Sequence, residues 1–235
     1  MIQNEYVAFI ITAFIAVAWL RLIDYLANRG VFPSKISRKI IHIGTGPIFV
    51  LCWILFPEKT LSRYLAAIIP LLITMQFLFV GLGIMKDEKA VKAMSRSGDR
   101  KEILKGPLIY GIVFVVMTVL FWRENLVGIL TLMILCGGDG MADLVGSQYG
   151  AHKLPWAKNK SWQGSIAMFF GALILTFLVA GVFYLSEYSA LGIQYKVLPI
   201  LGIILIATIV ESMPSGDFDN FFVPLVSVIF ALLWL

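Results

Sequence analysis

The chain has 235 residues, of which 60% are hydrophobic, and its mean hydropathy is +0.90. Soluble domains contain about 45–50% apolar residues, so this composition excludes a water-soluble globular protein and predicts one membrane-embedded domain over residues 1–235. The net charge of +5 comes from 19 Lys and Arg residues against 14 acids. These bases fall mostly in short connecting segments, which indicates membrane topology and no nucleic-acid partner.

Eight apolar segments are long enough to cross about 30 Å of hydrocarbon. The first, 6–23, lacks a basic leader and a small-residue cleavage site, so we expect a retained helix and not a signal peptide. The second is short, and seven spans are the alternative. We predict an all-α polytopic bundle of about eight transmembrane helices, at residues 6–23, 40–56, 61–85, 106–122, 126–148, 164–185, 197–213 and 219–235. Cys52 and Cys136 fall inside these segments and are expected to be small buried side chains.

The connecting segments alternate in charge. Segments 24–41, 86–105 and 149–163 hold 14 of the 19 Lys and Arg residues. The positive-inside rule therefore places these segments in the cytoplasm and both termini on the non-cytoplasmic side. The same cytoplasmic face, which nucleotides can reach, then collects several charged residues at or near helix ends: Asp139, Asp143, Lys160, Glu211 and Asp219.

Asp139 and Asp143 lie at the end of a long apolar run and are flanked by glycines. A separation of four residues keeps both side chains on one helical face, about 6 Å apart along the axis. Intramembrane acids are costly and usually functional, and Mg²⁺ is commonly held by one or two carboxylates plus substrate phosphates. We therefore expect a metal-assisted phosphate site. The alternative is that one aspartate caps a helix or pairs with a lysine.

A second motif runs from Lys160 to Ser165. Ser161 is expected to cap the following helix, whose free N–H groups favour phosphate, and Lys160 adds a positive charge for the same anion. Gly164 and Ser165 permit either close helix packing or close approach of a ligand. The alternative is ordinary interfacial anchoring beside a packing face of small residues.

Further polar residues occur at the ends of three other predicted helices. Arg38 and His42 are four residues apart and share a face. His42 is expected to orient a phosphate, to act as a general base, or to bond a neighbouring helix. The alternative for Lys39 is that it only anchors the interface. Glu211 ends the seventh predicted helix, and Asp219 is expected to cap the eighth. The charged stretch 96–107 is equally consistent with a solvated loop and with part of the site.

Several of these motifs resemble one known family. The residues from Gly138 to Gly146, Lys153 to Pro155 and Lys160 to Phe169 resemble the phytol kinase and farnesol kinase group, which is related to dolichol kinases and more distantly to CDP-diacylglycerol synthases. Residues 38–44, 97–100 with 105–107, and Glu211 with 219–225 are similar to its other motifs. The resemblance extends from about Ser37 to Leu225.

Membership implies a polytopic enzyme that uses CTP and a divalent metal, Mg²⁺ or Mn²⁺, to phosphorylate a prenyl alcohol such as phytol, farnesol, geranylgeraniol or a polyprenol. We expect Asp139 and Asp143 to hold the metal. Asp143, Glu211 and His42 are all candidates for the group that accepts the alcohol's proton. The residues expected to bind the nucleotide are Arg38, Lys39, Asp99, Arg100, Lys105, Lys153, Lys160, Ser161, Gly164, Ser165, Asp219 and Asn220.

Three other functions use similar parts. A CTP-dependent diacylglycerol kinase differs in the alcohol accepted, and a lipid-phosphate cytidylyltransferase would release pyrophosphate in place of CDP. A transporter would suit intramembrane acids, but no inverted repeat is visible and the polar residues gather at one face. The sequence does not determine the oligomeric state, and a homodimer is one of the alternatives.

Overall fold

The computed structural model describes residues 2–31, 34–95, 97–186, 192–214 and 216–235. Each of the eight predicted segments coincides with an apolar helix. They are α1 (Glu5–Asn28), α2 (Ser34–Leu51), α3 (Thr60–Leu82), α5 (Gly106–Leu120), α6 (Leu126–Met133) with its continuation to Tyr149, α8 (Trp162–Leu185), α9 (Val197–Glu211) and α10 (Asp219–Trp234). Among the described residues, five helical segments are long and apolar enough to cross a membrane, and three further apolar helices are shorter. The protein is therefore an all-α membrane protein.

Short elements join these helices. They are the helix α4 (Glu88–Met94), the 3₁₀ turns Cys52–Leu55, Arg100–Leu104, Ile193–Tyr195 and Gly216–Phe218, and the strands β1 (Lys153–Leu154) and β2 (Ala157–Ser161). The two strands form an antiparallel hairpin in which Lys153 faces Ser161. The sequence predicted only a connecting segment over 149–163, and the structure adds this hairpin to it. The indole N–H of Trp156, at the hairpin tip, donates to the carbonyl of Ser212 at 3.0 Å, so the hairpin is fixed against the end of α9.

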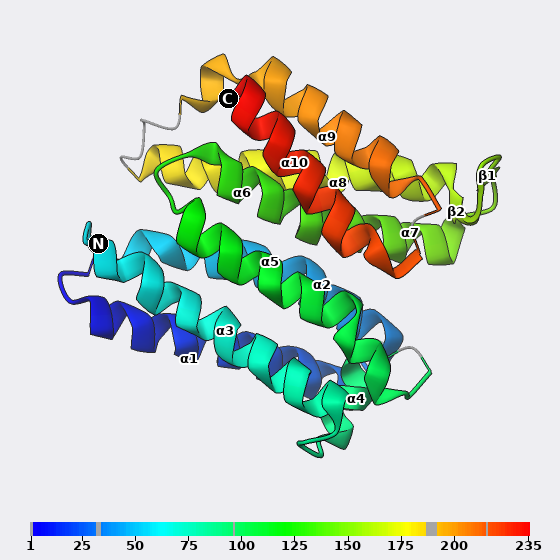
Figure 1. The fold of residues 1–235 in the computed structure, drawn as a ribbon, viewed down its shortest axis with the longest axis horizontal. Coiled ribbons are helices and arrows are strands. Elements are labelled where there is room, and N and C mark those ends of the chain that lie inside the picture. The colour runs from blue at the N-terminus through cyan, green and yellow to red at the C-terminus, as the bar shows by residue number, and fades with distance from the viewer. Residues whose placement is uncertain (1, 32–33, 96, 187–191, 215) are drawn as a thin grey trace.

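Both termini lie at one end of the bundle, and α4, α7 and the hairpin lie at the other (Figure 1). The helices α1 to α5 form one half of the molecule and α6 to α10 the other, as the figure shows. The three base-rich connections therefore gather at a single end, opposite the termini. This arrangement agrees with the charge pattern of the sequence.

The core is built around the helical segment that starts at Leu126. In the most apolar 18-residue stretch of this segment, 83% of the residues are buried. In the corresponding stretch of α1, only 17% are buried. Every residue of α6 is buried, and a helix that is apolar on all sides suits a position surrounded by other helices. Cys52 and Cys136 are buried free thiols, as expected.

Glycines allow α8 to lie directly against this central segment. A Cβ atom added to Gly171 would lie 2.5 Å from the carbonyl oxygen of Gly137, and one added to Gly164 would lie 3.2 Å from the carbonyl oxygen of Ala142. At Gly171 no side chain larger than hydrogen fits unless the helices separate, whereas at Gly164 the neighbouring carbonyl would have to move by a few tenths of an ångström. Gly164 therefore lies in close packing between α8 and α7, one of the two roles considered for it.

Candidate active site

The predicted acidic pair sits on an interruption of the central helix. Residues Ile134–Asp139 form a single π-helical turn, and α7 (Gly140–Tyr149) continues from it. Asp139 is the last residue of the π turn, and Asp143 lies in the first turn of α7. Such turns are rare and often occur at functional sites. The sequence predicted a regular helix here, because hydropathy does not distinguish an α turn from a π turn.

Two side chains of α2 approach these acids. His42 Nε2 lies 3.4 Å from Asp139 Oδ2, and Lys39 Nζ lies 3.2 Å from Asp143 Oδ2. Lys39 also donates to the carbonyl of Asp143 at 2.7 Å and to Ser147 Oγ at 2.6 Å. Its side chain is 4% exposed, so the alternative that Lys39 only anchors the membrane interface was wrong. The lysine pairing considered for one aspartate is present at Asp143.

Tyr110 of α5 supports His42 and was not predicted. Its hydroxyl donates to the carbonyl of His42 at 3.0 Å and lies 3.1 Å from Cys136 Sγ. Its ring centroid is 4.5 Å from that of the imidazole. The sequence feature that could have pointed to Tyr110 is its position, one turn into the helix that begins with the Gly106-Pro107 motif.

A second charged cluster joins the hairpin to the two C-terminal helices. Lys160 Nζ donates to Glu211 Oε1 at 2.5 Å and to Asp219 Oδ2 at 2.6 Å. The three side chains are between 5% and 16% exposed. Burial lowers the pKa of Lys160, but the two carboxylates outweigh it and hold that pKa above its usual value of 10.5. Lys160 is therefore charged at neutral pH, with its charge engaged by two acids.

Of the two predicted helix caps, the one on α8 is present and the one on α10 is not. Ser161 caps α8 as predicted, since its Oγ accepts from the Gly164 N–H at 3.2 Å. Asp219 does not cap α10; it is the first helical residue and Phe218 is the cap position. The carboxylate of Asp219 is instead turned to Lys160, a stronger partner than a backbone N–H.

The two clusters belong to one site. The helices α9 and α10, which carry Glu211 and Asp219, both pack against the π turn that carries Asp139. Four carboxylates thus gather near two lysines, and the excess of negative charge favours a cation. Among the described residues, no three His, Cys, Asp or Glu side chains are arranged to hold a metal by themselves. Asp139 and Asp143 fit Mg²⁺ only if phosphate oxygens supply further ligands, which is the usual arrangement for this ion.

Three of the predicted site residues carry buried polar atoms without a hydrogen-bond partner among the described residues. These atoms are His42 Nε2, Ser165 Oγ and Asn220 Oδ1. Buried polar atoms are rarely left unsatisfied. His42 Nε2 is the one of the three with a described contact to an acid, 3.4 Å from Asp139 Oδ2, so a ligand at that carboxylate could complete it.

The remaining predicted residues are placed less centrally. Asp99 caps the 3₁₀ turn by accepting from the Lys101 N–H at 2.9 Å, and the guanidinium of Arg100 covers Gly83. Lys105 precedes α5, whose first residue, Gly106, lies against the Asn220 amide. Lys153 is exposed on the hairpin. No described contact joins Asp99, Arg100 or Lys153 to the acids, and the side chain of Arg38 lies outside the described residues.

The fold and this site together define a helical membrane protein with an acid-rich polar site at one end of its bundle. The chain is 39% identical to a probable phytol kinase 3 of Glycine max, over 93% of this chain and 69% of that protein. It is 36% identical to phytol kinase 1 of Arabidopsis thaliana, over 89% of this chain and 70% of that protein. It is 35% identical to the farnesol kinase of the same plant, over 93% of this chain and 71% of that protein. All three relatives are named as chloroplastic.

The chain belongs to the phytol kinase and farnesol kinase family, as its motifs suggested. No protein-family model and no solved structure matches it.

Proposed function

We propose that this protein is a CTP-dependent kinase that phosphorylates the hydroxyl group of a prenyl alcohol, producing the prenyl monophosphate and CDP. The observation that carries this proposal is the acid-rich site with unsatisfied polar atoms, at the end of an apolar bundle, in a chain related to phytol and farnesol kinases. The bundle offers an apolar phase for the alcohol's chain. The site offers acids and bases where an aqueous nucleotide can meet its hydroxyl.

Asp139 and Asp143 are the residues that would hold Mg²⁺ or Mn²⁺ together with nucleotide phosphates. The metal would offset the negative charge that accumulates during phosphoryl transfer. Lys39 would keep Asp143 in place, because it bonds both the carbonyl and the carboxylate of that residue.

His42 is best arranged to accept the proton of the alcohol. Asp143 is paired with Lys39, and Glu211 with Lys160, whereas His42 Nε2 has no hydrogen bond within the described part of the chain. In the proposed step the alcohol oxygen bonds to the γ-phosphorus of CTP, its proton passes to Nε2, and the bond from that phosphorus to the β-phosphate oxygen breaks to release CDP. Asp139, 3.4 Å away, would stabilise the imidazolium.

The orientation in the membrane is part of the same proposal. Eight spans with both termini outside would place the site at the cytoplasmic face, where CTP is available. The clustering of the base-rich connections at the site's end of the bundle supports this orientation.

The proposal is tested by product analysis with purified protein. CTP or ATP is supplied with phytol, farnesol, geranylgeraniol, a long polyprenol or diacylglycerol, and the products are identified. We expect a prenyl monophosphate and CDP; pyrophosphate would indicate a cytidylyltransferase, and diacylglycerol phosphorylation a different lipid kinase.

Asp139→Asn and Asp143→Asn should each reduce this activity at least about 100-fold, by removing a metal ligand, with unfolding temperatures close to the parent protein. Glu58→Gln is the matched control, because Glu58 is an exposed acid in the connection that leads to α3, next to Lys59, which pairs with Glu5 at the start of α1. Full activity in both aspartate variants would refute the metal role.

A further inference from the structure

The imidazole of His42 is held by contacts with two other elements. The ring of Tyr110, on α5, lies 4.5 Å from it between centroids, at an interplanar angle of 37°. The backbone of Gly140, the first residue of α7, also lies against it, since a Cβ atom added there would be 3.1 Å from His42 Cδ2. Gly140 directly follows Asp139. The absence of a side chain at this glycine therefore lets the imidazole and the acid approach to 3.4 Å.

The hydroxyl of Tyr110 joins α2, α5 and the π turn. It donates to the His42 carbonyl at 3.0 Å, and a phenol has only one proton to donate. In the contact of 3.1 Å between this hydroxyl and Cys136 Sγ, the thiol is therefore the donor. A directed chain of hydrogen bonds runs from the Cys136 thiol through the Tyr110 hydroxyl to the His42 carbonyl. Because Cys136 belongs to the π turn that ends at Asp139, this chain links the candidate base to the acid beside it.

One glycine of α2 provides the space for this chain. A Cβ atom added to Gly46 would overlap the Sγ atom of Cys136. Gly46 is four residues beyond His42, so the two residues share a face of α2. Any side chain at position 46 would displace the thiol, and with it the donor to Tyr110.

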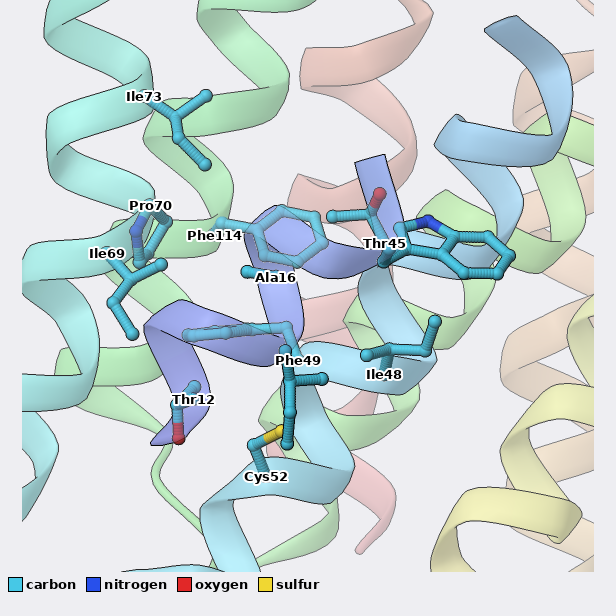
Figure 2. A pocket seen from close by; sticks show the side chains of 12 residues that line it. Thr12, Ala16, Thr45, Ile48, Phe49, Cys52, Ile69, Pro70, Ile73 and Phe114 are labelled. Atoms are coloured by element: carbon cyan, nitrogen blue, oxygen red, sulfur yellow. The ribbon is translucent and has the colours of Figure 1, made fainter. Parts of the chain in front are cut away.

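The packing behind the Tyr110 ring is incomplete. A second ring contact is with Phe114, 4.8 Å away on the same helix. Phe114 borders a small apolar cavity together with Phe49 and Ile69 (Figure 2). The cavity has a volume of about 40 Å³, so the atoms that line it lack some of the dispersion attraction of a filled core. The two hydrogen bonds of the hydroxyl are therefore the directional contacts that fix the Tyr110 ring.

We propose that Tyr110 is a positioning residue, which together with Cys136 holds His42 where Nε2 can accept the proton of the alcohol beside Asp139. The proposal rests on the function proposed above. Tyr110 would touch neither the alcohol nor the nucleotide. Its hydroxyl fixes the backbone of His42, and its ring limits the rotation of the imidazole. A misplacement of about 1 Å can cost about 100-fold in rate, so the loss of these contacts should slow the transfer step.

The first test is Tyr110→Phe, which keeps the ring and removes both hydrogen bonds of the hydroxyl. We expect kcat with the prenyl alcohol to fall at least about tenfold. The KM for CTP should change by less than about twofold, because the groups proposed to bind the nucleotide are retained. Tyr64→Phe is the matched control, since Tyr64 is exposed on α3, and should leave both values unchanged. A kcat of Tyr110→Phe equal to that of the parent protein would overturn the proposal.

A double-mutant cycle distinguishes positioning from a general structural effect. His42→Gln removes the proposed proton acceptor, and Tyr110→Phe should then have little further effect on the residual kcat, because residues that act as a unit are not additive. A structural effect would lower kcat by the same factor in both backgrounds, and that result would overturn the proposal. Parent-like activity of His42→Gln would refute His42 as the proton acceptor and the role of Tyr110 with it, but not the kinase activity.

The thiol supplies a second pair of variants. Cys136→Ala removes only the donor to the Tyr110 hydroxyl, whose bond to the His42 carbonyl remains. Its loss of kcat should therefore be smaller than that of Tyr110→Phe, and Cys136→Ser, which keeps a donor, should recover part of it. A larger loss in Cys136→Ala than in Tyr110→Phe would contradict the hydrogen-bond chain, since the packing of the thiol would then matter more.

A spectroscopic measurement tests the positioning without any activity. The chain contains two histidines, so protein isotopically labelled in its imidazole rings gives two sets of NMR signals, and His152→Gln identifies the set of His42. In Tyr110→Phe the His42 signals should shift and broaden, whereas those of His152, which is exposed, should not change. Unchanged His42 signals would overturn the proposal even if the protein proves to be a kinase. Changed His42 signals in a protein that phosphorylates no alcohol would support the positioning and refute only the kinase proposal.

Discussion

Lys160 holds two carboxylates from different helices in a place that water barely reaches. Glu211 ends α9 and Asp219 begins α10, and neither has room to be solvated if the lysine is removed. Removing one partner of a buried ion pair is strongly destabilising, by about 3–5 kcal/mol, because the remaining charge is left uncompensated. The lysine therefore links three elements and sets the charge of the site.

Lys160→Met should lower the midpoint of thermal unfolding in detergent by several degrees and abolish kinase activity. The raised pKa of Lys160 means that its stabilising charge is complete below the usual lysine pKa and is lost only as the pH rises through the higher value. The loss caused by the substitution should therefore be constant between pH 6 and pH 9. Lys158→Met, at an exposed position on the same strand, should behave like the parent protein; equal stability of the two variants would contradict the role of the buried cluster.

Residue spacing alone could not identify which bases of α2 reach the acids. The pair predicted to share a face was Arg38 with His42, whereas the side chains seen beside Asp139 and Asp143 are His42 and Lys39. Positions three and four apart are both neighbours on a helix, so the choice depends on how the helix is rotated in the bundle. Tyr110 was missed for the same reason, because its contacts with His42 and Cys136 join three separate helices.

At the scale of elements, glycines determine how closely α8 approaches the π turn. Gly171→Ala would place a Cβ atom 2.5 Å from the backbone oxygen of Gly137, so the helices would have to separate. We expect a lower unfolding midpoint and reduced activity, because the π turn carries Asp139. Gly181→Ala on the same helix has open space around the added atom and should be neutral or slightly stabilising, since alanine favours helices. The two purified variants can be compared by thermal unfolding; similar behaviour would show that helix propensity and not packing governs α8.

Hydropathy was sufficient to locate the apolar helices, because each must present an apolar surface either to lipid or to the core. It could not locate the hairpin, whose strands of two and five residues carry too few residues to show alternation. The Ser161 cap was predictable because capping is local in sequence. The partners of Lys160 were not, since Glu211 and Asp219 lie more than fifty residues away.

At the scale of the whole molecule, one end of the bundle carries the polar candidate site and the other end carries both termini. If the base-rich connections are cytoplasmic, a cysteine placed at Lys158 should react with a membrane-impermeant maleimide only in inside-out vesicles. One placed at Glu58 should react only in right-side-out vesicles. The native thiols do not interfere, because Cys52 and Cys136 are buried. Labelling of both positions from the same side would contradict the proposed orientation.

The π turn makes the length of one segment as important as its composition. A π turn contains one residue more than an α turn, so deletion of any one residue between Ile134 and Asp139 would let the helix close into regular α geometry. Everything after the deletion would then keep about its present rotation relative to α6, because the residue removed is the extra one. One residue lost from the regular first turn of α7, such as Met141, would instead rotate everything after it by about 100°, and Asp143 and Ser147 would leave Lys39 together. A single codon lost within the π turn should therefore be tolerated far better than one lost a turn later in the same helical segment.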